Sequence, residues 1–131
     1  MEGKFFPLSM RPLSTAELAL FRQTAQRRNL EVQAHLAQRL GLAKRVAAEA
    51  ADLLKHEFRA TQVVLFGSLM HPERFHPSSD IDLAVAGLPP LDYFVAVAKL
   101  QDLSVFKVDL VRLERCPPGL KVAIETEGRV L

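Results

Sequence analysis

The stretch Ser79-Asp80-Ile81-Asp82-Leu83-Ala84-Val85 places two aspartates in a sequence that otherwise predicts a buried β-strand. Side chains alternate along a strand, so the apolar residues are expected to face a core while Asp80 and Asp82 share the opposite face. Two neighbouring carboxylates repel each other and are costly to desolvate unless a cation lies between them. Mg²⁺ prefers carboxylate oxygens and leaves room for phosphates. The stretch therefore predicts a metal-dependent phosphate site.

Two further predicted strands lie on either side of this stretch in the sequence. Residues 62–66 are apolar and β-branched, and they end at Gly67-Ser68, which predicts a tight turn where the main chain can approach a ligand closely. Residues 105–111 form the other predicted strand, and Asp109 interrupts it with a third carboxylate. We expect the three aspartates to form one acidic cluster.

The order of these motifs resembles the active-site pattern of the DNA polymerase β-type nucleotidyltransferases, and above all their minimal nucleotidyltransferase (MNT) subgroup. The pattern consists of Gly67-Ser68 after one strand, Asp80-x-Asp82 about a dozen residues later, and Asp109 in a following strand. The resemblance spans roughly residues 42–131. It implies an α/β (α+β) fold in which helices pack on a short mixed sheet.

The resemblance also implies roles for these residues. Asp80, Asp82 and Asp109 would be the catalytic residues and the ligands of two Mg²⁺ ions, with Asp109 nearer the attacking group. Gly67 and Ser68 would bind the phosphates of the substrate, ATP.

Two features depart from the family pattern. Family members commonly carry arginine directly after the glycine-serine pair, whereas this chain has Leu69, and its loop to Asp80 is about one residue longer than usual. Arg74, His71 or His76 could supply the missing positive group, and Arg74 is our candidate nucleotide-binding residue. Without such a cation, phosphate binding would be weaker than in typical relatives.

Structural interpretations compete with each assignment. Asp80 could cap the strand, Asp82 could be a solvent-facing edge residue, and Asp109 could form an ion pair with Lys107, which shares its strand face. The two histidines His71 and His76 lack a third ligand at a spacing typical of zinc sites.

Outside the motifs, the N-terminal part of the chain predicts helix. Ser14-Thr15-Ala16-Glu17 forms a capping box that opens a helix at about Thr15. The helical pattern resumes from residue 31 to residue 58, with Gly41 as the expected interruption. We place an N-terminal helical arm at residues 1–41 and the nucleotidyltransferase domain at residues 42–131.

The C-terminal half alternates helices with strands. Helices are predicted at residues 91–103 and from Pro117-Pro118 to about Glu127, followed by a short tail. We expect the helices to pack on one face of the sheet.

Composition limits the class of protein. The chain has 131 residues, one cysteine and a formal net charge of +2, so strong electrostatic binding of nucleic acid is not expected. No apolar stretch approaches the ~20 residues that span a bilayer, and no secretory leader is recognisable. A soluble protein of the cytoplasm, without membrane association, is expected.

The resemblance further implies a partner. Small MNT proteins form toxin-antitoxin pairs with HEPN-domain ribonucleases, and MntA-like antitoxins transfer AMP from ATP to a tyrosine of the toxin. The expected activity is thus protein adenylylation. A hetero-oligomer of this chain with the toxin is a further expectation. A non-catalytic binding module that neutralises its partner by contact is the alternative. Transfer to a small molecule such as an antibiotic is a third option, although no domain for such an acceptor is evident.

Overall fold

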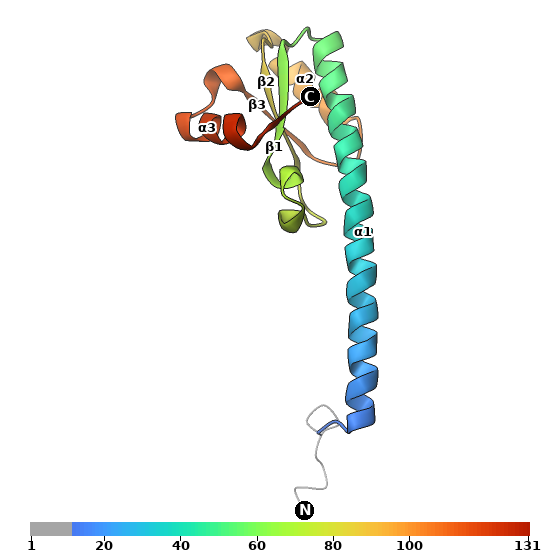
Figure 1. The fold of residues 1–131 in the computed structure, drawn as a ribbon. Helices are drawn as coiled ribbons and strands as arrows, with labels where there is room; N and C mark the ends of the chain where they lie inside the picture. Colours follow the sequence, from blue (N-terminus) through green and yellow to red (C-terminus); the bar gives the residue numbers. More distant parts are fainter. Residues whose placement is uncertain (1–11) are drawn as a thin grey trace, which may run out of the picture. The chain divides into compact units, whose positions relative to one another are not determined.

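The computed structural model describes residues 12–131 (Figure 1). Four strands and the helices between them follow one another along the chain: α1 (Thr15–His56), β1 (Gln62–Phe66), β2 (Ile81–Ala86), α2 (Tyr93–Gln101), β3 (Val108–Arg112), α3 (Pro118–Glu127) and β4 (Arg129–Val130). Short 3₁₀ helices connect them: η3 (Gly67–Met70), η4 (Pro72–Arg74), η5 (Pro90–Asp92) and η6 (Leu113–Arg115). Two compact units make up the chain, one ending at His35 and the other comprising Leu36–Leu131. The predicted division into residues 1–41 and 42–131 stays a prediction.

The sheet is mixed, as expected. Its strand order is β3-β2-β1-β4. Strand β1 pairs antiparallel with β2 and β4, whereas β2 and β3 are parallel. Parallel neighbours need a crossover connection, and α2 with η5 provides it here. This topology confirms the α+β class.

Helices cover both faces of the sheet, so the expected packing on one face is wrong. The main core joins the second half of α1 and helix α2 to one sheet face, which carries Val63, Leu65, Ile81, Leu83 and Val85. A smaller core joins Ile124 of α3 to Val64 and Ala84 on the opposite face. Figure 1 shows α3 on the side of the sheet away from the second half of α1. The alternation of β1 and β2 residues between the two cores follows directly from the side-chain period of a strand.

Helix α1 is continuous from Thr15 to His56, so the predicted interruption at Gly41 does not occur. One glycine costs a helix about 1 kcal/mol relative to alanine, and this cost is offset by the packing of the turns that follow it. Ala43, Ala47 and Ala50 are fully buried against the sheet. At the helix start the predicted capping box is confirmed, because the Glu17 amide donates to Ser14 Oγ at 3.1 Å.

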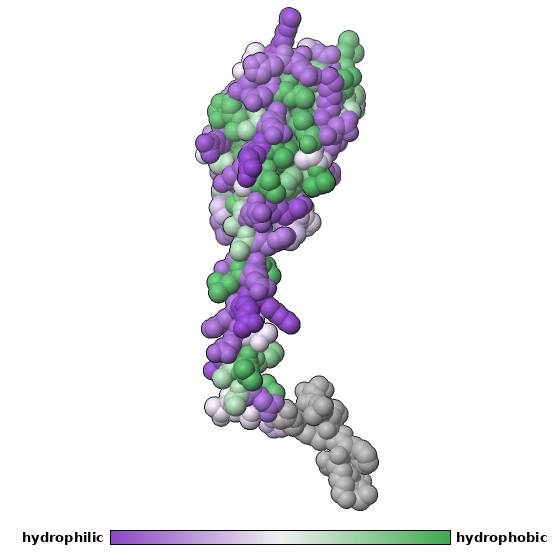
Figure 2. Space-filling view, turned by 90° about the vertical axis from the view of Figure 1, so that its right-hand side faces the viewer, coloured by the Kyte–Doolittle hydropathy of each residue, from purple (hydrophilic) through white to green (hydrophobic). Residues whose placement is uncertain are grey.

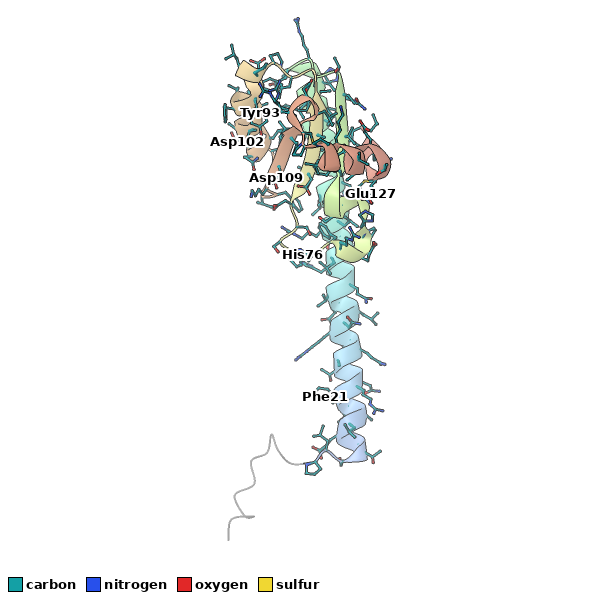
Figure 3. All side chains as sticks on the ribbon, turned by 90° about the vertical axis from the view of Figure 1, so that its left-hand side faces the viewer. Phe21, His76, Tyr93, Asp102, Asp109 and Glu127 are labelled. Carbon is teal, nitrogen blue, oxygen red and sulfur yellow. The ribbon has the colours of Figure 1, made fainter. Side chains whose placement is uncertain are left out.

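In its first half, α1 leaves large apolar side chains exposed. Phe21 is 66% exposed (Figure 3). Leu20 and Leu30 are exposed to a similar degree. Figure 2 shows such apolar side chains beside hydrophilic ones along this part of the helix.

Two boundaries in the second half of the chain differ from the prediction. Strand β3 starts at Val108 instead of residue 105, because a local turn in which the Phe106 amide donates to Ser104 Oγ precedes it. Val105 is exposed and is not part of Asp109's strand face. The predicted tail instead contributes β4, which pairs with β1.

None of the helices within residues 12–131 is both long enough and apolar enough to cross a lipid bilayer.

Candidate active site

The stretch 79–85 folds as its alternation predicts. Strand β2 begins at Ile81, directly after Asp80, and its burial alternates around Asp82. Ile81, Leu83 and Val85 are fully buried, while Asp82 is half-buried. Asp82 therefore lies on the sheet face that α3 covers, near the N-terminal end of β2.

Strand pairing brings a second carboxylate beside Asp82. In the parallel β2–β3 pair, Asp82 is the register partner of Asp109. Neighbouring strands are about 4.8 Å apart, and register partners point to the same face of a sheet. The structure thus places these two predicted site residues side by side on adjacent strands, with Asp80 two residues before Asp82. Figure 3 labels Asp109 among them.

Gly67 packs against the carboxylate of Asp82. Phe66, the last residue of β1, is the register partner of Asp82 on the other side of β2. Gly67 follows it with a φ of +78°, and a Cβ built on Gly67 would lie 2.2 Å from Asp82 Oδ2. Both the left-handed backbone and this close approach require glycine. The predicted glycine-serine turn therefore lies against the acidic cluster.

The cluster is electrostatically strained. Burial, followed by the negative charges of Asp109 and Asp80, raises the pKa of Asp82 from its ordinary value of 3.8 to about 6. Lys107 opposes the shift. A carboxylate that is disfavoured by neighbouring carboxylates indicates a site that a cation would stabilise.

Lys107 is the cation nearest to this cluster for which a contact is seen. Its Nζ lies 3.8 Å from Asp109 Oδ1, and both side chains are well exposed. The ion pair that competes with a catalytic role for Asp109 is therefore present, although an exposed pair at this distance contributes little. The alternation of side chains along the strand predicted that Lys107 and Asp109 share a face. It did not predict that Lys107 also lowers the pKa of Asp82.

The donor chemistry of the cluster fits Mg²⁺, which prefers carboxylate oxygens. Nevertheless, within the described part of the chain no three acidic, histidine or cysteine side chains are grouped closely enough to hold a metal ion. The backbone already pairs Asp82 with Asp109. The side chains of Asp80, Asp82 and Asp109 would have to rotate toward one another to bind a shared ion.

Ser68 and Leu69 follow Gly67 in η3. Ser68 is half-buried, and its carbonyl oxygen accepts from the His71 amide at 3.1 Å. Leu69 is 1% exposed and belongs to the main core. The position that commonly carries arginine in the family thus serves packing in this chain.

The residues that could replace that arginine, His71, His76 and Arg74, make no hydrogen bond or ion pair with the aspartates in the described part of the chain. His71 lies 3.4 Å from Glu127 Oε2, and His76 Nδ1 lies 2.9 Å from Ser78 Oγ. Arg74 is exposed on η4, and no ion pair involving it is found among residues 12–131. The structure does not bring Arg74 into contact with the aspartates, and its nucleotide-binding role stays a prediction.

Solved structures with the same fold include nucleotidyltransferases and toxin-antitoxin complexes. A structure assigned to a minimal nucleotidyltransferase is 27% identical, with a TM-score of 0.59 over 70% of this chain and 95% of its own. A toxin-antitoxin complex with AMP-PNP is 26% identical, with a TM-score of 0.54 over 63% of this chain and 69% of its own.

A third solved structure shows the fold alone. It is the HEPN toxin of Shewanella oneidensis in complex with its MNT antitoxin, at 24% identity and a TM-score of 0.52, covering 67% of this chain and 70% of that one. Among curated protein sequences, no significant match is found.

The family described as "Polymerase beta, Nucleotidyltransferase" matches residues 48–131, which include β1, the Gly67-Ser68 turn and all three aspartates. This match covers more than half of the chain, and the four-stranded sheet and the three aspartates lie within it. The chain belongs to the polymerase β-type nucleotidyltransferase family.

Proposed function

We propose that this protein is a Mg²⁺-dependent nucleotidyltransferase that moves AMP from ATP to a tyrosine of a HEPN-family toxin, and that it acts as the antitoxin of that pair. The observation that carries the proposal is the register of Asp82 with Asp109 beside the Gly67 turn. The toxin-antitoxin complex with AMP-PNP, which shares the fold, supports both the nucleotide and the kind of partner.

In the proposed reaction, the phenolic oxygen of the acceptor tyrosine forms a bond to the α-phosphorus of ATP. The bond from that phosphorus to the bridging oxygen of pyrophosphate breaks, and the phenolic proton leaves to a base. Two Mg²⁺ ions, when bound, would neutralise charge on the attacking and leaving oxygens.

The residues of the chain have distinct tasks in this scheme. Asp80 and Asp82 would hold both ions, and Asp109 would hold the ion nearer the tyrosine and help to accept its proton. Backbone amides at Gly67 and Ser68 would bind the β and γ phosphates. Gly67 lies against Asp82, so phosphates held there would be kept close to the carboxylates.

Label transfer tests this proposal. The full chain is incubated with ATP labelled at the α-phosphate, Mg²⁺ and the protein encoded beside it, which we predict to carry a HEPN domain. We expect label on the partner, and its loss of at least 100-fold in Asp80→Ala and Asp82→Ala, since removal of a single charge-stabilising group in an active site costs 10²–10³-fold. Lys121→Ala, an exposed change on α3, is the matched control.

A second function is favoured by one observation. Leu69 is buried where the family commonly has arginine, so an inherited nucleotide pocket could serve a module that silences its partner by contact alone. Full neutralisation of the toxin by Asp80→Ala and Asp82→Ala would establish this second function and rule out the first.

A further inference from the structure

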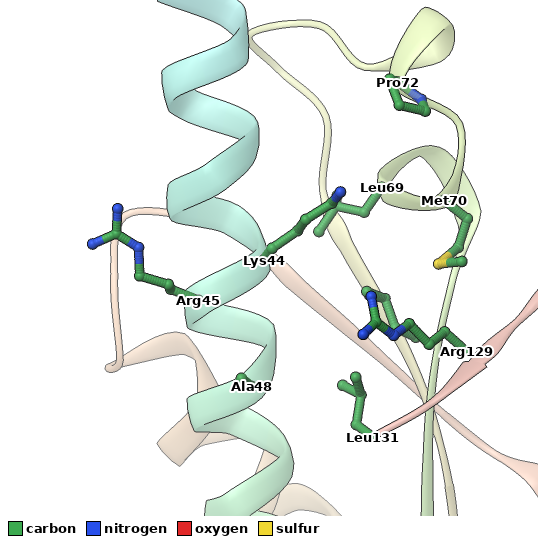
Figure 4. A pocket seen from close by; sticks show the side chains of 9 residues that line it. Lys44, Arg45, Ala48, Leu69, Met70, Pro72, Arg129 and Leu131 are labelled. Atoms are coloured by element: carbon green, nitrogen blue, oxygen red, sulfur yellow. The ribbon is translucent and has the colours of Figure 1, made fainter.

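A concave site lies apart from the aspartates, on the sheet face that α1 covers. It is a pocket of about 390 Å³ between α1, β1, η3 and the C-terminal strand (Figure 4). The apolar side chains of Leu65, Leu69, Met70 and Leu131 contribute to its lining, and Leu65 belongs to the main core.

Cationic side chains surround this apolar floor. Lys44 and Arg129 extend into the pocket from α1 and β4, whereas Arg45 extends away on the far side of the helix (Figure 4). The pocket lining contains no acidic residue. Lys44 and Arg129 are both exposed, and within residues 12–131 neither forms an ion pair with a carboxylate.

The pocket and Asp82 lie on opposite faces of the sheet, and the link between the pocket and the proposed reaction site is the short helix η3. One wall is formed by Leu69 and Met70, the third and fourth residues of η3, and the first two residues of η3 are Gly67 and Ser68. A partner segment anchored in the pocket would therefore contact the same short helix, η3, that begins with the proposed phosphate-binding residues Gly67 and Ser68. Transfer to a protein requires such an anchor, because the acceptor side chain must be positioned for in-line attack.

We propose that this pocket is the docking site for a partner protein, which inserts an apolar side chain flanked by carboxylates. The apolar floor would receive the apolar side chain, and Lys44 and Arg129 would pair with the acidic groups. Charge complementarity of this kind selects the partner and speeds its association. The proposal rests on the function proposed above, since it supplies the contact by which the acceptor is held.

Charge reversal with a matched control tests the docking site. The double variant Lys44→Glu/Arg129→Glu is compared with Arg115→Glu/Lys121→Glu, which changes the net charge equally at exposed positions outside the pocket. Affinity of the full-length chain for the HEPN-domain protein is measured by biolayer interferometry, and thermal unfolding verifies that each variant is folded. We expect the pocket variant to bind at least tenfold more weakly, and the control to bind within threefold of wild type.

Each outcome decides for or against the docking site. Equal weakening by both variants, unchanged affinity in the pocket variant, or absence of any complex with the wild-type chain overturns it. Calorimetric titration with ATP alone distinguishes a docking site from a nucleotide-binding site. A pocket variant that loses ATP binding but still forms the complex also overturns the docking proposal. If the complex depends on the pocket but no AMP is transferred, the docking site stands and the proposed reaction fails.

Discussion

At the scale of single residues, Gly67 is the position where backbone conformation and site chemistry meet. Its φ of +78° and its contact with Asp82 leave no room for a side chain. Asp82 in turn carries a charge that the fold disfavours, because burial and two neighbouring aspartates raise its pKa to about 6.

We expect Gly67→Ala to lower the free energy of unfolding by about 1–2 kcal/mol, since a left-handed conformation costs a non-glycine residue that much, and to weaken nucleotide binding as Asp82 is displaced. Urea unfolding measures the first effect and ATP titration the second. Gly41→Ala is the control, because its Cβ would meet nothing within 4 Å. That change is expected to stabilise helix α1 by up to about 1 kcal/mol, and equal effects of both substitutions would contradict our account.

The raised pKa of Asp82 predicts a pH-dependent stability. Below pH 3.8 the carboxyl is protonated in both folded and unfolded states. As the pH rises toward about 6, the unfolded chain ionises first, so the free energy of unfolding falls and stays lower above that pH. With solvent screening of this half-exposed group, the loss is about 1–2 kcal/mol.

Asp82→Asn is expected to remove this loss, so that the variant is more stable than wild type at pH 7.5 and equally stable near pH 3.5. Urea unfolding at both pH values measures the difference. Adding Mg²⁺ at pH 7.5 is expected to stabilise the wild type and leave the variant unchanged. A variant that is less stable at pH 7.5 would show that Asp82 is not electrostatically strained.

At the scale of elements, the second half of α1 is fitted to the sheet by small residues. Ala43, Ala47 and Ala50 are fully buried and belong to the main core between α1 and the sheet. Leu69 joins the same core from η3. Different residues of α1, all of them exposed, line the pocket of the proposed docking site: Lys44, Arg45 and Ala48.

Ala50→Leu is expected to destabilise the protein by about 1–3 kcal/mol, because extra methylene groups overpack a filled core. Ala48→Leu on the same helix is the control, since Ala48 is exposed and its substitution should change stability by no more than about 0.5 kcal/mol. Guanidinium unfolding of the two variants provides the comparison. Equal destabilisation by both changes would argue against the burial of Ala50 in the core between α1 and the sheet.

At the scale of the whole molecule, the buried core lies in the unit that comprises Leu36–Leu131. Residues 12–35 contribute no buried side chain. We therefore expect a protein starting at residue 36 to unfold cooperatively, with a free energy of unfolding within about 1 kcal/mol of the full chain. Urea titration followed by circular dichroism tests this, and a non-cooperative transition would contradict it.

Local sequence patterns were enough to predict much of the fold and to select the residues of the candidate site. The capping box at Ser14, the alternation around Asp82 and the turn at Gly67 depend on interactions between residues close in sequence. The order of these motifs was enough to recognise the family, because the catalytic pattern follows the order of strands along the chain.

Pairings between distant segments could not be predicted in this way. The register of Asp82 with Asp109, the pairing of β4 with β1, the burial of Leu69 and the placement of α3 on the second sheet face all depend on contacts between segments far apart in sequence. The periodicity of one strand states which side chains share a face, but not which strand lies beside it or what covers that face. For this reason the chain order revealed the parts of the candidate site, and the packing of the sheet brought them together.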